Sequence, residues 1–369
     1  DGEAGGHDKP EPVGEVEGQD PVVRRAPVKP SPEEVERHYA THIPRRAWCK
    51  VCAEAALQED PHRKSGVDHK DDGIPEVHMD YKELRKGKRP FLVMRERASG
   101  ATFGVRCLNK GDSDEWAVKA CNEKLVSWGL SKVRLSIKSD GEPAIKAFRK
   151  AMKDGRVPET VFGTSPPRDP QSNGVAERAV GELASQLRRL KLGLEARLKT
   201  TIANDHSVVD WMAQHSGFLI TKYLRGSQDG FTAHQRLHGR EFRGEVVEFG
   251  EMVWAKPRRT GRKVNKDKED PLGARGVEGV WIGIHEETGE NLVALLGQRS
   301  PVIRVRTVMR RPEDERWNAD AVMAISAEPR CPHPKMPENS GVLTFGQAAN
   351  CRLDDDPEGE SDDGKDVDD

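Results

Sequence analysis

Three acidic residues stand where the chain is expected to pass from one structural element to another. Asp80 lies inside a short apolar run, Asp140 follows a second such run, and Glu177 opens a long amphipathic stretch. Carboxylate oxygens suit Mg²⁺ or Mn²⁺, and three of them at element ends can hold two ions for in-line phosphoryl transfer. Each acid alone is more simply a helix cap or a surface charge, but a carboxylate within an apolar strand, such as Asp80, is costly to bury without a partner. The three acids are therefore candidate catalytic and Mg²⁺-binding residues.

A second group of residues has the composition of a zinc site. His38 and His42 are four residues apart in a segment with helix signals, and Cys49 and Cys52 follow as a Cys-x-x-Cys pair. Residues four apart share one face of a helix, and two imidazoles with two thiolates form the tetrahedral set that Zn²⁺ prefers. The alternative is a reduced cysteine pair beside surface histidines.

Two groups of basic residues could contact a polyanion. The first follows Glu177 along the expected helix and consists of Arg178, Arg188, Arg189 and Lys191. The second lies in a loop over about 256–275 and includes Arg258, Arg259, Arg262 and Lys263. Phosphate contacts from such side chains give salt-sensitive binding with little sequence preference. For each group a solvated surface is the alternative.

Hydrophobic patterns predict the elements that must position these residues. Strands are expected near 76–81, 91–94, 102–108, 133–137 and 160–162. Helices are expected near 31–42, 113–128, 143–152, 175–192 and 206–223. Between 76 and 223 this order indicates an α/β core with a mixed sheet. After Gly244, four or five short strands with glycine-rich turns predict a small β-barrel.

The elements divide the chain into six predicted segments. These are a disordered linker (1–30), a His/Cys zinc-binding module (31–60), a linker (61–75), a catalytic core (76–243), a DNA-binding β-barrel (244–312) and a disordered acidic tail (313–369). Ten acidic and two basic side chains lie between Arg352 and Asp369, so the rest of the chain carries +6 against a total of −2. This mildly basic remainder permits a polyanionic partner.

Composition excludes several classes of protein. No apolar run approaches the roughly 18 residues that span a bilayer, and the N-terminal segment is acidic and rich in Gly and Pro. We therefore expect neither a membrane protein nor a newly secreted one. Six cysteines in 369 residues are too few for a disulfide scaffold. Because the chain begins at Asp1, we expect a piece of a longer product.

Four short motifs carry a resemblance to a known family. They are Met79-Asp80-Tyr81, the run 139–144 (SDGEPA), Thr164-Ser165-Pro166, and the run 170–178 (PQSNGVAER). Together they resemble the catalytic core of retroviral and retrotransposon integrases, most closely that of copia-type polyproteins, over about residues 31–311. The resemblance implies an RNase H-like fold and a catalytic triad of Asp80, Asp140 and Glu177. The 36 residues between Asp140 and Glu177 fit the family spacing.

The same resemblance implies the remaining modules and the activity. The His/Cys group is similar to the N-terminal zinc module of integrases, with a shorter gap between the histidines and the cysteines. Retroviral relatives contact the DNA end through basic residues one and two turns after the catalytic Glu, where this chain has Gly181 and Ala184. The expected function is 3′-end trimming of element DNA and its joining to a target duplex. A homo-oligomer acting in the nucleus is expected. The alternatives are a decayed or domesticated DNA- or chromatin-binding module and a DDE transposase.

Overall fold

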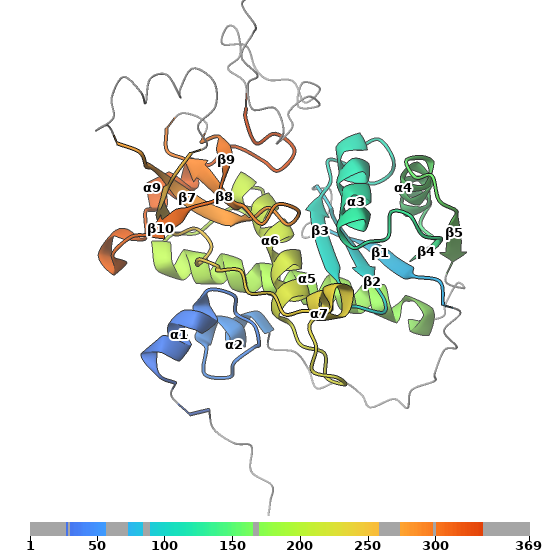
Figure 1. The fold of residues 1–369 in the computed structure, drawn as a ribbon, viewed down its shortest axis with the longest axis horizontal. Coiled ribbons are helices and arrows are strands. Elements are labelled where there is room, and N and C mark those ends of the chain that lie inside the picture. The colour runs from blue at the N-terminus through green and yellow to red at the C-terminus, as the bar shows by residue number, and fades with distance from the viewer. Residues whose placement is uncertain are drawn as a thin grey trace, which may run out of the picture.

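A five-stranded mixed sheet is the central element of the larger part of the molecule (Figure 1). The computed structural model describes residues 27–28, 30–56, 73–83, 89–164, 170–257, 274–297 and 300–334. The sheet has the order β3-β2-β1-β4-β5 and consists of β1 (Glu76–Lys82), β2 (Phe91–Glu96), β3 (Thr102–Arg106), β4 (Leu135–Ser139) and β5 (Thr160–Thr164). The first three strands pair antiparallel, whereas β1, β4 and β5 pair parallel. This is the RNase H-like arrangement, so the predicted fold class is confirmed.

Helices cover both faces of this sheet. One face packs against α3 (Glu115–Ser127) and α4 (Pro143–Asp154), and the other against α5 (Pro170–Leu198) and α6 (Ser207–Tyr223). In β2, Leu92 belongs to the cluster with α3 and α4, while its neighbour Phe91 belongs to the cluster with α5 and α6. In β1, Met79 packs with α3 and α4. Since successive strand side chains point to opposite faces, Asp80 lies on the face covered by α5.

The helix α5 links the N-terminal helices to the five-stranded sheet. It has 29 residues and starts at Pro170, five residues before the predicted start, and it ends at Leu198. Its apolar positions are buried at intervals of three to four residues, as Val180, Leu183, Leu187 and Leu190 show. This spacing forms one continuous stripe along a helix. Along its length α5 contacts β1, β2, α6 and the N-terminal helix α2 (Lys50–Ala56).

The C-terminal strands form a second, antiparallel sheet. Its order is β10-β6-β7-β8-β9, with β6 (Met252–Ala255), β7 (Val277–Ile284), β8 (Asn291–Leu295), β9 (Val302–Val305) and β10 (Val308–Arg310). The outer strands β9 and β10 are joined by two residues, which span at most about 11 Å between Val305 and Val308. Five strands laid flat would separate them by about 19 Å. The sheet must therefore curl around its core of Val253, Trp281 and Val293, which gives the predicted barrel.

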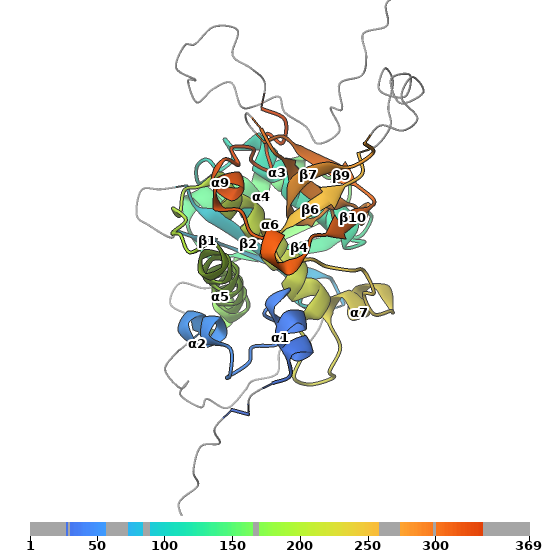
Figure 2. The same ribbon diagram turned by 90° about the vertical axis from the view of Figure 1, so that its left-hand side faces the viewer.

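The N-terminal helices lie beside α5 in both views (Figures 1 and 2). The helix α1 (Pro32–Tyr39) begins as predicted, because the Ser31 hydroxyl accepts a hydrogen bond from the Glu34 N–H at 3.2 Å. It ends three residues earlier than predicted, before His42. The short helix α2 was not predicted. No helix in the described part of the chain is long and apolar enough to cross a membrane.

Residues 313–334 differ from the disordered tail that the sequence predicts. The segment contains a 3₁₀ turn at Glu313–Glu315 and the helix α9 (Ala319–Met323), and Val322 and Ala327 are fully buried. The Trp211 indole donates a hydrogen bond to the Ala327 carbonyl at 2.8 Å. The few apolar residues of this segment thus cover the core. The sequence analysis predicted disorder because these residues are widely spaced within a polar segment. The predicted tail beyond residue 334 lies outside the described residues.

Candidate active site and candidate metal centre

The parallel pair β1 and β4 places two of the predicted acids next to each other. Along this pair His78 lies opposite Lys138. The same offset, carried two residues further, places Asp80 level with Asp140, the first residue after β4. Neighbouring strands are about 4.8 Å apart, so the two residues occupy adjacent positions at the end of the sheet.

The third acid, Glu177, comes from α5 and is exposed. Its position near the acid pair is visible in the electrostatics of Asp80. Burial raises the pKa of Asp80 to about 6, and the negative charges of Asp140 and Glu177 contribute to this rise. A hydrogen bond from the Tyr81 N–H to Asp80 Oδ1, 2.7 Å long, opposes it. The structure therefore brings Asp140 and Glu177 within electrostatic range of Asp80.

Glu142 is a fourth acid in this cluster, and the sequence analysis did not select it. Its charge also raises the pKa of Asp80, and its backbone N–H donates to Asp140 Oδ1 at 3.1 Å. The carboxylate of Glu142 receives hydrogen bonds from the ammonium of Lys110 at 3.0 and 3.4 Å. Glu142 could have been selected from the sequence because it lies two residues after Asp140. Lys110 could not, because it belongs to a loop much earlier in the chain.

The acid cluster has the donor chemistry of a site for hard divalent cations. Among the described residues, neither Asp80 nor Asp140 forms an ion pair, although Arg149 is close enough to feel the charge of Asp140. The donors are carboxylate oxygens, which Mg²⁺ and Mn²⁺ prefer. The repulsion that Asp140 and Glu177 exert on Asp80 favours the binding of positive charge. These residues therefore fit Mg²⁺ or Mn²⁺.

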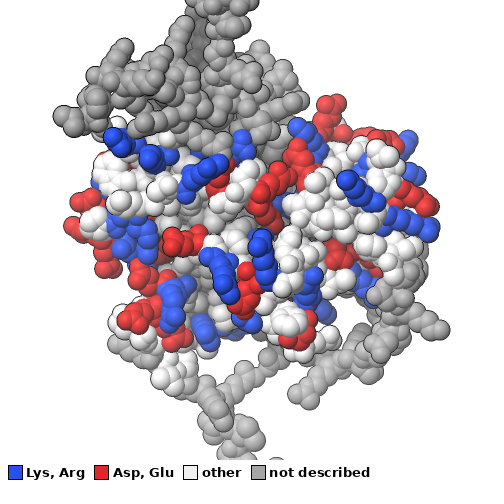
Figure 3. Space-filling view, in the orientation of Figure 1, with Lys and Arg blue, Asp and Glu red and all other residues white. Residues whose placement is uncertain are grey.

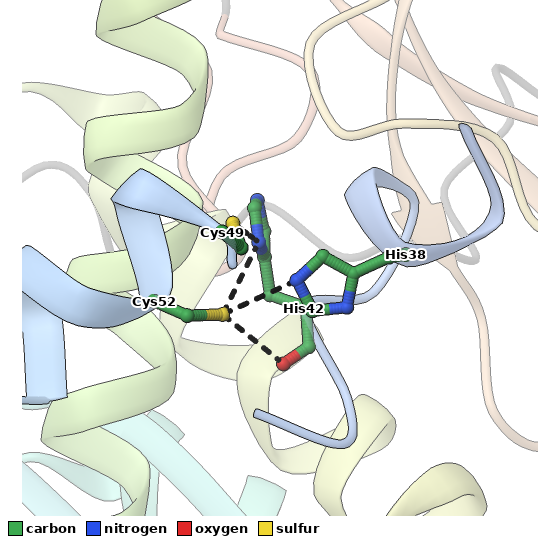
Figure 4. A group of neighbouring side chains, drawn as sticks. All are labelled: His38, His42, Cys49 and Cys52. Atoms are coloured by element: carbon green, nitrogen blue, oxygen red, sulfur yellow. Dashed lines mark hydrogen bonds between the residues drawn. The ribbon is translucent and has the colours of Figure 1, made fainter. Parts of the chain in front are cut away.

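The two histidines and two cysteines form one compact cluster (Figure 4). One potential ligand atom from each of His38, His42, Cys49 and Cys52 lies within 4.8 Å of all the others. The sulfur of Cys52 is 3.3 Å from His38 Nε2, and both sulfurs are 3.7 Å from His42 Nδ1. Zinc–sulfur bonds of about 2.3 Å and zinc–nitrogen bonds of about 2.1 Å at tetrahedral angles require about 3.6 Å between such atoms. The cluster therefore has the dimensions of a tetrahedral zinc site.

Burial favours the neutral form of three members of this cluster, His38, His42 and Cys52. It lowers the pKa of His38 to about 4 and that of His42 to about 3, and neutral imidazole is the form that binds a metal. It raises the pKa of Cys52 to about 11. His42 does not reach the cluster through helical spacing, because it lies beyond the end of α1 with a left-handed backbone (φ 52°). The four predicted residues thus lie together, but His42 joins them from the chain after α1 and not from a shared helix face.

Three of the four basic residues predicted on α5 contact protein. The Arg188 guanidinium donates to the Ala55 carbonyl of α2 at 2.6 Å, and the Arg189 guanidinium donates to Gln186 Oε1 at 3.0 Å. Lys191 pairs with Glu195 at 2.7 Å. The Arg188 contact holds α2 on α5, whereas the other two contacts lie within α5. Only the exposed Arg178 stands beside Glu177.

A cavity of about 520 Å³ begins at Glu177 and extends towards the His/Cys module. It is lined by Glu177, Arg178, Gly181, Arg189 and, from the chain after His42, Arg45. Its lining thus contains three arginines together with Glu177 and Glu182. The predicted loop residues Arg258, Arg259, Arg262 and Lys263 lie outside the described residues. On the face shown in Figure 3, basic and acidic residues are interspersed and no large area carries one sign.

Comparisons with known proteins identify only remote structural similarity. No family model matches the sequence, and no curated protein matches it. A chain of the simian T-cell lymphotropic virus intasome in complex with PP2A regulatory subunit B56 gamma matches 72% of this chain and 87% of its own length, with 16% identity and a TM-score of 0.36. The catalytic core domain of BIV integrase matches 45% of this chain and 94% of its own, with 22% identity and a TM-score of 0.32. The HTLV-2 integrase catalytic core domain in complex with magnesium matches 45% and 99%, with 15% identity and a TM-score of 0.33. Since all three TM-scores are low, the fold assignment rests on the strand order described above.

Proposed function

We propose that this protein is a retroelement integrase of the copia type, which trims the 3′ end of element DNA and joins that end to a target duplex. The observation that supports the proposal is the register of β1 and β4, which sets Asp80 level with Asp140 in an RNase H-like sheet, together with the effect of Glu177 on the pKa of Asp80. Asp80 lies in β1, Asp140 directly follows the parallel strand β4, and Glu177 lies on α5, which packs on β1. The four motifs quoted above support the same assignment.

The three carboxylates would hold two Mg²⁺ or Mn²⁺ ions. When bound, such ions supply charge neutralisation and activate a water or a hydroxyl for in-line phosphoryl transfer. The protein contributes the positions of the acids. Asp80 is fixed by its place in β1 and by the Tyr81 N–H, and Asp140 is fixed by the N–H of Glu142. The same acids would serve the trimming step and the joining step, because both are attacks on a phosphodiester.

The other modules would bind metal and DNA in support of this chemistry. His38, His42, Cys49 and Cys52 would hold one Zn²⁺, and these residues would then link α1 and the chain after it to α2, which docks on α5. Arg178 and the loop residues Arg258, Arg259, Arg262 and Lys263 would contact DNA phosphates of the element ends and the target. A homo-oligomer in the nucleus, derived from a larger polyprotein, completes the proposal.

The decisive test is a divalent-metal titration of the full chain on a labelled duplex carrying the terminal sequence of the element. We expect nicking near the 3′ end and strand-transfer products with Mg²⁺ or Mn²⁺, and neither product with chelator. The conservative variant Glu177→Gln should still bind the duplex but form neither product. A protein that binds DNA but never cleaves it at any metal concentration would instead be a DNA-binding module, and the integrase proposal would be wrong.

A further inference from the structure

Lys110 lies at the edge of the acid cluster, in the connection between β3 and α3. Its ammonium pairs with Glu83 Oε1 at 3.1 Å and with Glu142 Oε1 at 3.0 Å. It also lies 5.6 Å from the centre of the Tyr81 ring. The hydroxyl of that tyrosine accepts a hydrogen bond from the Gly111 N–H at 3.1 Å, which fixes the backbone next to Lys110. The ammonium is therefore held in one place by side-chain and backbone contacts.

The two carboxylates that hold Lys110 follow the two aspartates closely in the chain. Glu83 lies three residues after Asp80, and Glu142 lies two residues after Asp140. Lys110 thus spans the ends of β1 and β4, where the proposed catalytic residues stand. Among the described residues, it is the cation that forms ion pairs with the carboxylates flanking this end of the sheet.

The ammonium of Lys110 remains accessible to a ligand. Its side chain is 31% exposed, and those of Glu83 and Glu142 are 35% and 36% exposed. Ion pairs at such exposure contribute little, because water competes with them and salt screens them. A phosphate oxygen can therefore replace one of the two carboxylates at little cost. Glu83 is the one to leave, because Glu142 accepts hydrogen bonds from the ammonium with both carboxylate oxygens, at 3.0 and 3.4 Å, whereas Glu83 forms only an ion pair at 3.1 Å.

We propose that Lys110 contacts a backbone phosphate of the bound DNA beside the acid cluster, and that Glu83 occupies this position in the free protein. Glu83 then acts as a competitor for the phosphate, and Glu142 keeps the ammonium aligned. The inference rests on the proposed function, since DNA is the ligand. The phosphate contact would come from the β3–α3 connection, a segment that contains neither a run of basic residues nor one of the four motifs.

The test measures binding of the full chain to two unrelated duplexes across a salt series without added Mg²⁺ or Mn²⁺, so that no cleavage occurs and any zinc stays bound. Lys110→Ala should weaken binding to both duplexes and reduce the slope of log affinity against log salt by about 0.9, the value for one phosphate contact. Between 50 and 200 mM salt this variant should therefore lose about threefold less affinity than the wild type. Lys110→Arg should restore the slope. Lys119→Ala is the matched control, because Lys119 also pairs with a carboxylate (Glu123, 3.4 Å) and is 54% exposed, but it lies on α3.

Glu83→Gln separates a phosphate contact from a structural brace. If Lys110 contacts phosphate, removing its competitor should strengthen binding, and the double variant with Lys110→Ala should bind like Lys110→Ala alone. If the ion pairs only brace the strand ends, Glu83→Gln should weaken binding and lower the melting temperature as Lys110→Ala does, and the inference would be wrong. An unchanged salt slope in Lys110→Ala would overturn it while wild-type binding upheld the proposed function. Absence of DNA binding by the wild type would overturn both.

Discussion

The His/Cys cluster and the acid cluster present opposite electrostatic situations. The four His/Cys ligand residues are buried, come from one short stretch of the chain (38–52), and lie at metal-binding distances from one another. The acids are partly or fully exposed and negatively charged, and they come from two strands and a helix that are far apart in the sequence. The first cluster holds a small module together, whereas the second concentrates like charges that oppose folding. We infer that metal at the first serves structure and metal at the second serves chemistry.

The largest effect should come from Asp140→Asn. The substitution removes a metal-ligating charge but no apolar contact, so we expect trimming and strand transfer to fall about a thousandfold or more, given the several kcal/mol that metal ions supply to such reactions. The circular dichroism spectrum should not change. Asp154→Asn, at the exposed end of α4, is the matched control and should keep full activity. Substantial activity of Asp140→Asn in Mg²⁺ would remove the distinction between the two clusters.

A smaller but still large effect is expected for Cys52→Ser. Loss of a direct ligand should weaken zinc binding by more than the roughly 10–100-fold that loss of an outer partner costs. The purified wild type should contain one equivalent of zinc and lose helical signal on chelation, because folding and metal binding are coupled in small modules. Metal analysis with circular dichroism measures both. A metal-free wild type with an unchanged spectrum on addition of chelator would support the reduced-thiol alternative.

Asp80→Asn should increase the stability of the protein, whereas Cys52→Ser should weaken its zinc module. Because the pKa of Asp80 is raised to about 6 in the folded protein, its ionisation costs stability as pH rises from its ordinary pKa through 6. In metal-free buffer at pH 7.5 the variant should therefore be more stable than the wild type by about 1–2 kcal/mol, allowing for partial exposure. The difference should disappear below about pH 4, where the wild-type carboxyl is protonated in both states. Denaturant unfolding at the two pH values measures it, and a destabilised variant at pH 7.5 would contradict the repulsion described here.

The smallest effects are expected for substitutions of two arginines of α5. Arg178→Ala should reduce the salt slope of DNA binding by about 0.9, because Arg178 is exposed beside Glu177. Arg188→Ala should leave that slope unchanged and instead loosen the docking of α2, since its guanidinium is bonded to the Ala55 carbonyl. Hydrogen exchange of the α2 amides measures the docking. Equal slopes for the two variants would show that α5 does not separate a DNA-facing part from a protein-facing part.

Much of the fold could be predicted from the sequence because its strands are short and apolar and its long helices are periodic. The mixed sheet, α3, α4 and α6 were expected close to their observed positions, and the four or five short strands predicted after Gly244 correspond to β6–β10. The helices α2 and α7 (Ala233–His238) were not, because seven and six residues are too few for a periodic pattern. The start of α5 at Pro170 was hidden by the Pro, Ser, Asn and Gly of its first turns, residues that are typical of loops.

The candidate sites show the same division between local and long-range information. The ligand set of the His/Cys cluster could be selected because its members are close in the chain, but the left-handed backbone at His42 could not. The proximity of Asp80, Asp140 and Glu177 was expected from the motif resemblance. The approach of Lys110 to Glu142 depends on the packing of the β3–α3 connection against the start of α4, for which no local pattern exists.

The continuous α5 also fixes the distance between the acid cluster and the N-terminal module. Gln186 and Arg188, which hold the chain after α1 and the end of α2, lie roughly three turns after Glu177 on the same helix. At about 1.5 Å per residue, the module is held roughly 14–17 Å along the axis from the acid cluster. Bases stack at about 3.4 Å, so this interval equals about four to five steps of a duplex. For a DNA end that contacts both places, the length of α5 would therefore set the distance between the cleavage point and the contact with the module. Inserting or deleting residues in α5 would change this distance and leave the three acids unchanged.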